Sequence, residues 1–508
     1  MRRDRVRKMK KLAIAAAALS LLALTAFTAC AADAPVPASS GDAQLASGDW
    51  IAMANRYPIP DVSGKISGAP TPEVLASWWD SLGDETLTQL IATALENNRS
   101  LSTARSKVTE ARASLGISKA AVLPWLDSTN YWSAGRTPVE VGGSGSKVDV
   151  YKLGIDASWE IDIFGGKHQT IKAGAADLEA QYAELNSVWV SLSAEIASDY
   201  VSLRTLQQRL AIARNNLALQ KETYALVDSR YKAGLTDTLA LNQSKYVLEQ
   251  TDASIPPLEA SIEQVKNGLA ILTGLVPGAL EDMLGETRPI PQINAGVIIG
   301  IPANALRQRP DIRAAERQLV AQIARKKAAK ADLWPKFYLV GSIGTEALNT
   351  GSLFEGPNKL YSLGPQITFP IFHWGAIKNN IKVQTSKQEQ ALNNYEQTVL
   401  TAVGEVRNAV TAVLKERMRR ESLARGTDAA KAALAVASDK YKSGLVDFNN
   451  VISAQQSLLS LSEQYAVSEG QITTDGIQLF KALGGGWAPM DAEAAAQAAK
   501  ADKKAAKK

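Results

Sequence analysis

Residues 167–233 read KHQTIKAGAADLEAQYAELNSVWVSLSAEIASDYVSLRTLQQRLAIARNNLALQKETYALVDSRYKA. These 67 residues contain no proline and one glycine, Gly174. Apolar and aromatic side chains recur along the stretch, mostly at steps of three, four or seven: Ile171, Leu178, Tyr182, Leu185, Trp189, Leu192, Ile196, Leu203, Leu206, Leu210, Leu217, Tyr224, Val227 and Tyr231. This heptad-like pattern predicts one continuous α-helix. At ~1.5 Å per residue the helix would be about 100 Å long, which is longer than a compact domain is wide.

The long stretch has a second copy 210 residues later. Residues 376–443 also lack proline, and the two copies end alike, in Arg230-Tyr231-Lys232-Ala233-Gly234-Leu235 and Lys440-Tyr441-Lys442-Ser443-Gly444-Leu445. Glycine is the usual residue just beyond a helix C-terminus, because it adopts left-handed backbone angles at little cost. We therefore expect each long helix to end there and a second helix to return, over 239–272 and 451–480.

A pattern of period two precedes each long stretch. From Tyr151 to Ile163, apolar residues at odd positions alternate with polar residues or glycine at even positions. This alternation predicts a strand with one apolar and one polar face. Tyr361–Ile371 keeps the same phase 210 residues later, and weaker strands over 126–134 and 337–343 are the expected hairpin partners. A helix is expected before each strand pair, over 87–119 and 303–332.

The start of the chain resembles a bacterial export signal. Met1–Ala29 carries seven Lys/Arg against one Asp and is apolar from Leu12 onward. The only cysteine, Cys30, follows directly and cannot form an internal disulfide. The signal resembles a lipobox, with Phe27 where an aliphatic residue is usual, so Cys30 is predicted to be lipidated; a free or buried thiol is the alternative. Ala31 resembles the signal for sorting to the outer membrane.

These patterns divide the chain into six predicted segments. They are a signal peptide at 1–29; a lipidated N-terminal linker at 30–72; a first repeat at 73–277, with strands at about 125–138 and 148–164 and a helical hairpin at about 167–275; an inter-repeat linker at 278–302; a second repeat at 303–487, with strands at about 335–347 and 359–373 and a hairpin at about 376–483; and an Ala/Lys tail at 488–508, expected to be disordered.

Charge and motif content argue against two classes of function. The formal net charge is +5, of which the first 29 residues supply +6 (seven Lys/Arg minus one Asp), leaving −1 for the remainder. No basic surface for nucleic acid is therefore expected. The chain has two histidines and lacks a P-loop, paired-cysteine metal spacing and a nucleophile elbow. We predict no enzyme, no catalytic residue, no cofactor and no metal.

The strands favour a membrane β-barrel over a soluble sheet with one wet face, which would show the same alternation. They exceed the roughly 9–11 residues that cross a bilayer at a tilt. Aromatic residues lie near their ends, at Tyr151, Trp159, Phe164, Tyr361, Phe369, Phe372 and Trp374. Four strands per chain fall short of the about eight that close a membrane barrel, so several chains must contribute strands.

Taken together, these features resemble the TolC-like outer-membrane efflux proteins, most closely their lipoprotein branch, which serves resistance-nodulation-division (RND) pumps. The resemblance covers about 72–487. It is carried by the duplicated order of helix, strand pair and helical hairpin, by the two hairpin turns, by Ala454-Gln455, and by Leu306-Arg307-Gln308-Arg309-Pro310-Asp311-Ile312 with Arg313, Ala315 and Glu316.

The resemblance implies a mainly α protein with a membrane β-barrel. Three chains would form one twelve-stranded β-barrel in the outer membrane on a long α-helical barrel in the periplasm. The implied function is passive export of small toxic compounds or drugs, which reach the channel from an inner-membrane RND pump through a periplasmic adaptor, the membrane fusion protein. A conduit for protein secretion and a lipid-anchored periplasmic coiled-coil adaptor or scaffold are the alternatives.

The resemblance also implies functional residues at the hairpin turns. Family acidic gate positions fall on Asn450 and Ser453, and a family arginine position falls on Val446, with Asp447 beside it. We expect a periplasmic gate whose neutral ring selects cations less than an acidic one would; ordinary polar positions are the alternative. Exposed leucines at a turn need a partner, so the tips, Gly234, Leu235, Gly444 and Leu445, are expected adaptor contacts. Helix capping by the glycines and packing of the leucines within a trimer is the other interpretation.

Overall fold

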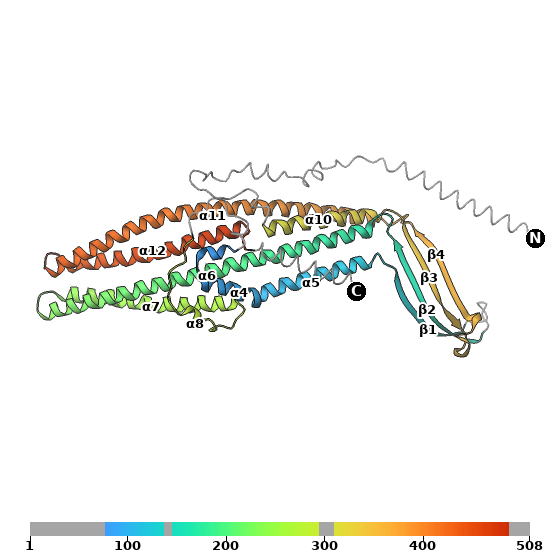
Figure 1. The fold of residues 1–508 in the computed structure, drawn as a ribbon, viewed down its shortest axis with the longest axis horizontal. Helices are drawn as coiled ribbons and strands as arrows, with labels where there is room; N and C mark the ends of the chain where they lie inside the picture. The colour runs from blue at the N-terminus through green and yellow to red at the C-terminus, as the bar shows by residue number, and fades with distance from the viewer. Residues whose placement is uncertain (1–76, 137–144, 294–308, 487–508) are drawn as a thin grey trace, which may run out of the picture. The chain divides into compact units, whose positions relative to one another are not determined.

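The structure, a computed structural model, describes residues 77–136, 145–293 and 309–486. All of them belong to the larger of two compact units, Pro60–Lys508 (Figure 1). Several predicted segments lie outside the described residues: the signal peptide, Cys30, the linker at 30–72, the Ala/Lys tail, and residues 306–308 of the stretch 306–312 that carries part of the family resemblance.

Two helices of 67 residues each dominate the described chain, α6 (Gly166–Lys232) and α11 (Ala376–Lys442). Each is followed by a returning helix of 35 residues, α7 (Thr238–Leu272) and α12 (Phe448–Ala482). The continuous helices predicted from the heptad-like pattern are therefore confirmed. α6 packs against α7, α12 and α10 (Pro310–Ala331), and α11 packs against α10 and α12.

The helix before the first strand pair differs from the prediction. The expected single helix over 87–119 is two helices, α4 (Glu85–Asn97) and α5 (Arg99–Ala120), so that prediction was wrong. The break lies at Asn98, which has extended backbone angles. Its side chain accepts a bond from Leu101 N at 2.9 Å and donates to Leu272 O on α7 at 2.8 Å. Leu101 follows Ala94 by seven residues and so keeps the helical phase across Asn98, and periodicity therefore could not reveal the break.

The strands form one antiparallel sheet in the order β1 (Trp125–Arg136), β2 (Lys147–Ile161), β3 (Lys336–Ala347) and β4 (Lys359–Thr368). Both predicted hairpins are confirmed, and β2 also pairs with β3, which joins the two repeats.

Two strands end before the predicted limits of 164 and 373. β2 ends at Ile161, because Ile163 N turns back to bond Ile161 O at 3.0 Å. β4 ends at Thr368, two residues before Pro370, which has no N–H to donate to a ladder.

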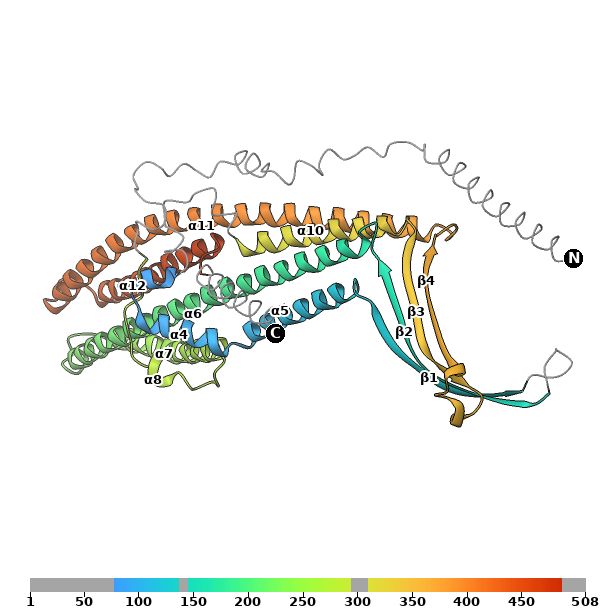
Figure 2. The same cartoon turned by 45° about the vertical axis from the view of Figure 1, so that its right-hand side comes forward.

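The sheet lies at one end of the long helices. α5 and α10 lead into β1 and β3, and β2 and β4 lead into α6 and α11, so four helix ends meet the sheet there (Figure 2). The two hairpin turns lie at the far ends of α6 and α11.

Shorter segments cover the middle of α6. The short helix η1 (Trp78–Leu82) buries Trp78, which stacks on Phe480 with ring centroids 5.3 Å apart. The described part of the predicted inter-repeat linker, 278–293, includes α8 (Glu281–Leu284). It is held against α6 and α12, because Leu284 O accepts a bond from Gln207 and Pro291 O accepts one from Thr473. Across the described ranges, no helix is both long and apolar enough to cross a membrane.

Candidate functional site

The two hairpin turns share one backbone motif. After α6, Leu235 N donates to Arg230 O at 2.8 Å and Gly234 N donates to Tyr231 O at 2.9 Å. This pair of bonds is the Schellman motif, which satisfies carbonyls that the helix end leaves without partners. The bonds from Leu445 N and Gly444 N repeat it after α11. Gly234 and Gly444 have φ of 72° and 73°, so both positions favour glycine.

An apolar cluster joins the two hairpins behind their turns. This tip cluster contains Val227, Ala240, Val247, Tyr441, Phe448, Val451 and Ile452. Arg230 of the first hairpin lies over the ring of Tyr441 in the second, 4.9 Å from its centroid. It also donates from Nη1 to Tyr441 O at 2.9 Å. Arg230 on α6 therefore contacts both the ring and the backbone of Tyr441 and helps to hold the two hairpins together.

The predicted adaptor contacts lie outside the tip cluster. The side chains of Leu235 and Leu445 are 68% and 73% exposed. Two apolar side chains at the tips thus face solvent in the single chain, while Gly234 and Gly444 form the turns behind them. Contact between these tips and an adaptor stays a prediction.

The predicted gate residues come together at the start of α12. Asn450 and Ser453 are exposed and lie one helical turn apart, on the side of α12 away from the buried Val451 and Ile452. Asp447 is also exposed and is the N-cap residue of α12, but its carboxylate caps no backbone N–H. Their role as a gate stays a prediction.

The two hairpins differ at the N-cap of the returning helix, a difference that the repeated sequence did not indicate. Asp237 begins α7 and accepts a bond from Ala240 N at 2.9 Å, whereas the Asp447 carboxylate makes no such bond. Val446, at the family arginine position, is partly buried against the tip cluster. Asp447, the only acidic side chain among the predicted gate residues, therefore does not cap its helix.

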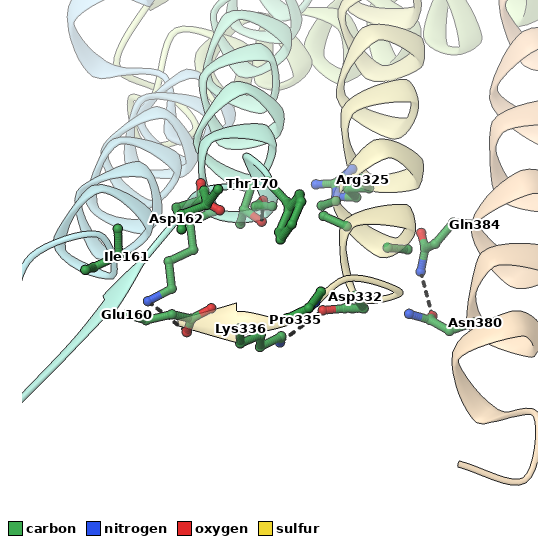
Figure 3. A pocket seen from close by; sticks show the side chains of 17 residues that line it. Glu160, Ile161, Asp162, Thr170, Arg325, Asp332, Pro335, Lys336, Asn380 and Gln384 are labelled. Atoms are coloured by element: carbon green, nitrogen blue, oxygen red, sulfur yellow. Dashed lines mark hydrogen bonds and ion pairs between the residues drawn. The ribbon is translucent and has the colours of Figure 1, made fainter. Parts of the chain in front are cut away.

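A polar pocket lies where the helices meet the sheet (Figure 3). Lys167 pairs with Glu160 at 3.1 Å and donates to Ala121 O at 2.6 Å. Lys336 pairs with Asp332 at 3.0 Å. These contacts tie the ends of β2 and β3 to the adjoining helix ends.

One histidine adds to this junction. His168 Nδ1 lies 2.7 Å from Asp162 Oδ2, and the same carboxylate oxygen accepts a bond from His168 N. Partial burial raises the pKa of Asp162, but hydrogen bonds from the His168 side chain and from the backbone of His168 and Lys167 outweigh it, so the pKa is lowered. The sequence patterns gave no signal of this carboxylate partner.

A buried arginine on α6 was also missed. Arg204 is fully buried and donates to Gln207 Oε1, Glu286 O and Tyr200 Oη. Tyr200 Oη in turn donates to Asp84 Oδ2 at 2.6 Å. Burial and the bond to Asp84 raise the pKa of Tyr200 to about 12. The heptad-like pattern gave no signal of this network, because it follows apolar residues only.

The described side chains form no cluster of three or more His, Cys, Asp or Glu that could hold a metal ion. The features that the structure does present are the joined helical hairpins and the sheet with exposed apolar strands.

The sequence model of the outer membrane efflux protein family matches residues 90–275 and 301–485. Nodulation protein T of Rhizobium leguminosarum bv. viciae is 30% identical over 435 residues, covering 85% of this chain and 89% of that relative. The probable outer membrane lipoprotein SilC of Salmonella typhimurium is 30% identical over 442 residues, covering 85% and 93%. The solved structure of the outer-membrane channel OprN has a TM-score of 0.78 at 32% identity and covers 85% of this chain and 98% of that chain.

The chain therefore belongs to the outer membrane efflux protein family. It is an efflux protein of the outer membrane, with the fold of the TolC-like channels. The two matched segments correspond to the two repeats, since each contains one strand pair and one helical hairpin.

Proposed function

We propose that three copies of this chain form one twelve-stranded β-barrel on an α-helical barrel, and that the assembly passively conducts small toxic compounds out of the cell. Four strands in one sheet, joined directly to paired helical hairpins, are the observation that carries this proposal. Relatives of this chain include a toluene efflux pump protein and a solvent efflux pump protein of Pseudomonas putida, which supports small toxic compounds as the cargo.

The two edges of the sheet support closure by neighbouring copies. β1 and β4 each have a partner on one side only. An open edge presents unpaired backbone donors and acceptors, and in lipid each unpaired group costs several kcal/mol. Pairing β4 of one copy with β1 of the next removes every open edge in a closed ring of copies.

The faces of the sheet support a membrane position. Ile155, Ile343 and Tyr361 lie opposite one another across three strands and are 51%, 65% and 86% exposed. Asp156, Ser342 and Gln366 belong to the other alternating set of these strands. A barrel with this alternation places apolar side chains against lipid and polar side chains toward a water-filled interior.

The tips and the start of α12 fit the remaining parts of an efflux assembly. We assign Leu235 and Leu445, with Gly234 and Gly444, to contact with a periplasmic adaptor that connects the channel to an RND-type pump. We assign Asn450, Ser453 and Asp447 to a constriction at the periplasmic entrance. Cys30 is assigned as the site of lipid attachment.

Purification and reconstitution test the channel itself. The full mature chain is expected to run as a trimer in detergent and to give single-channel conductance in planar bilayers. A monomer that does not enter bilayers would contradict the proposal. Deletion of the gene should increase susceptibility to a panel of toxic compounds and leave the secreted proteome unchanged. Loss of secreted proteins without any change in susceptibility would instead support protein secretion.

Cysteine substitution tests the gate and the tips separately. Asn450→Cys and Ser453→Cys should crosslink between chains and change conductance when modified, whereas Lys221→Cys, about 20 Å from the turn along α6 at ~1.5 Å per residue, serves as a control off the constriction. Leu235→Ser with Leu445→Ser should lower resistance without lowering conductance. Unchanged resistance would assign these leucines to packing. Cys30→Ser should abolish lipid labelling of the mature protein.

A further inference from the structure

The four helix ends that meet the sheet are strongly basic. They comprise residues 112–120 of α5, 166–176 of α6, 320–331 of α10 and 376–388 of α11, and they contain no Asp or Glu. Their eleven Lys and Arg residues are Arg112, Lys119, Lys167, Lys172, Arg325, Lys326, Lys327, Lys330, Lys378, Lys382 and Lys387. The chain after residue 29 has a net charge near −1, so this basic concentration is local to the junction.

Six of these residues form an exposed set that we name the basic collar: Lys119, Lys172, Lys327, Lys330, Lys378 and Lys382. Each lies within seven residues of its helix end, which is about 10 Å along the axis. Lys167 and Arg325 of the same helix ends pair with Glu160 and Asp177. The collar lysines, in contrast, form no ion pair within the part of the chain that the structure describes. Their charges are free to meet an external partner.

Helix stability does not explain half of the collar. Lysine near a helix C-terminus is favourable because it opposes the negative end of the helix dipole, and this accounts for Lys119 and Lys330, in the last turns of α5 and α10. Lys172, Lys378 and Lys382 lie near the N-termini of α6 and α11, where neither first turn contains an acidic residue. A cation in the first turn is unfavourable because the positive end of the helix dipole lies there, and Lys378 occupies that turn of α11. The helix dipole thus favours none of these three lysines and disfavours Lys378.

Aromatic residues lie between the collar and the sheet. Phe164 stacks on Trp334 with ring centroids 5.2 Å apart, and Phe372 lies edge-on to Trp374 at 4.6 Å. All four side chains are exposed, although Phe and Trp are large apolar groups. Aromatic belts of this kind lie at the level of lipid headgroups in membrane barrels. The collar begins within one or two helical turns of this level.

We propose that the basic collar binds anionic phospholipid headgroups of the inner leaflet of the outer membrane and so fixes the depth of the protein in the bilayer. This inference rests on the proposed membrane position of the sheet. The phosphate of an acidic phospholipid supplies the missing counter-charge. Each basic residue beside a membrane strengthens binding to anionic lipid by about fivefold in the binding constant. At the start of α6 and α11, phosphate would also offset the lysine charges at the positive end of the helix dipole.

The test measures lipid preference in vesicles that contain the full mature protein. Spin-labelled phosphatidylglycerol and phosphatidylcholine report, by electron paramagnetic resonance, which lipid is enriched at the protein boundary. Wild type is expected to prefer phosphatidylglycerol, and 0.5 M NaCl should largely remove the preference, because charge interactions at the surface are screened. The triple variant Lys172→Gln, Lys378→Gln, Lys382→Gln should reduce the preference at least fivefold.

The matched control removes three lysines far from the sheet. Lys221→Gln, Lys245→Gln, Lys431→Gln deletes the same charge from exposed positions in the tip-proximal parts of α6, α7 and α11, and its lipid preference should stay within twofold of wild type. Since none of the three lysines stabilises its helix through the dipole, their removal is not expected to lower helix stability by that route. The salt dependence of wild type tests the inference even if a variant fails to fold.

Conductance of the same vesicles separates this inference from the proposed function. If wild type conducts but enriches both lipids equally at its boundary, lipid binding by the basic collar is overturned and the proposed channel function stands. Absence of conductance in wild type would instead remove the channel. A triple variant with wild-type lipid preference and altered ion selectivity would place these lysines on the channel interior, and this result also overturns the inference.

Discussion

The Tyr200 hydroxyl connects the buried Arg204 to Asp84, the N-cap residue of α4. Tyr200→Phe keeps the ring on which the Arg204 guanidinium lies, 4.7 Å from the centroid, and removes only the hydroxyl. That hydroxyl accepts from Arg204 Nη2 at 2.9 Å and donates to Asp84 Oδ2 at 2.6 Å. Asp84 also caps α4 through its other carboxylate oxygen, which accepts bonds from Thr86 N and Leu87 N.

The expected cost follows from the groups that the substitution leaves without partners. Arg204 forms no ion pair within the described ranges, and its Nε already lacks a hydrogen bond there. Without the Tyr200 hydroxyl, Nη2 loses its bond as well, and Asp84 loses a charge-assisted bond. Hydrogen bonds to charged groups contribute about 1.5–3 kcal/mol each, less where water replaces the partner. We therefore expect a destabilisation of about 2–4 kcal/mol around α4.

Hydrogen–deuterium exchange of α4 measures this effect locally. A loss of ~2–4 kcal/mol corresponds to exchange faster by about 30- to 1000-fold. Tyr246→Phe is the control, because the Tyr246 side chain is 53% exposed on α7, and it should change exchange by less than about threefold. If α4 in Tyr200→Phe exchanges at the wild-type rate, the hydroxyl does not connect Arg204 to Asp84 as inferred.

Four further predictions concern the pH dependence of Tyr200 and three other parts of the molecule. The pKa of Tyr200 is raised to about 12 in the folded protein, above its unfolded value near 10. The stability that the neutral hydroxyl contributes is therefore complete below pH 10 and is lost as the pH rises toward 12. The difference in melting temperature between wild type and Tyr200→Phe should narrow over that range. Gly444→Ala should lower stability by about 1–2 kcal/mol, because it forces alanine into the left-handed region at φ 73°. Gly404→Ala in α11 has open space around it and should be neutral or stabilising. Limited proteolysis at the second turn should distinguish the two variants. Arg309→Lys should lower stability by about 2–3 kcal/mol, because Arg309 is buried and bonds Asp311, Glu405 and Ala482 O together; equal melting temperatures would contradict this. Asn450→Asp with Ser453→Asp should shift the reversal potential toward cations, and an unchanged potential would place these residues outside the constriction.

Features with a short sequence period could be predicted from the chain alone. The heptad-like spacing and the absence of proline predicted the two long helices to within about one residue at each end. The alternation predicted β2 and β4, with weaker strands as their hairpin partners β1 and β3. The glycines of the turns were identifiable because few residues tolerate their backbone angles. These signals are local, so a single segment is enough to express them. The proposed gate and tip residues came from family resemblance at these same turns.

The tertiary structure decided which distant residues meet. Arg230 contacts Tyr441 across 211 positions, Arg204 bonds Glu286 O across 82, and β2 pairs with β3 across the whole first hairpin. It also decided that Asn98 breaks a helix, since its partner is on α7. Periodicity reports the face of a helix or strand but not what packs on it. The sequence thus determined the lengths and repeats of the elements, and only the packing of one repeat on the other determined the networks that hold them together.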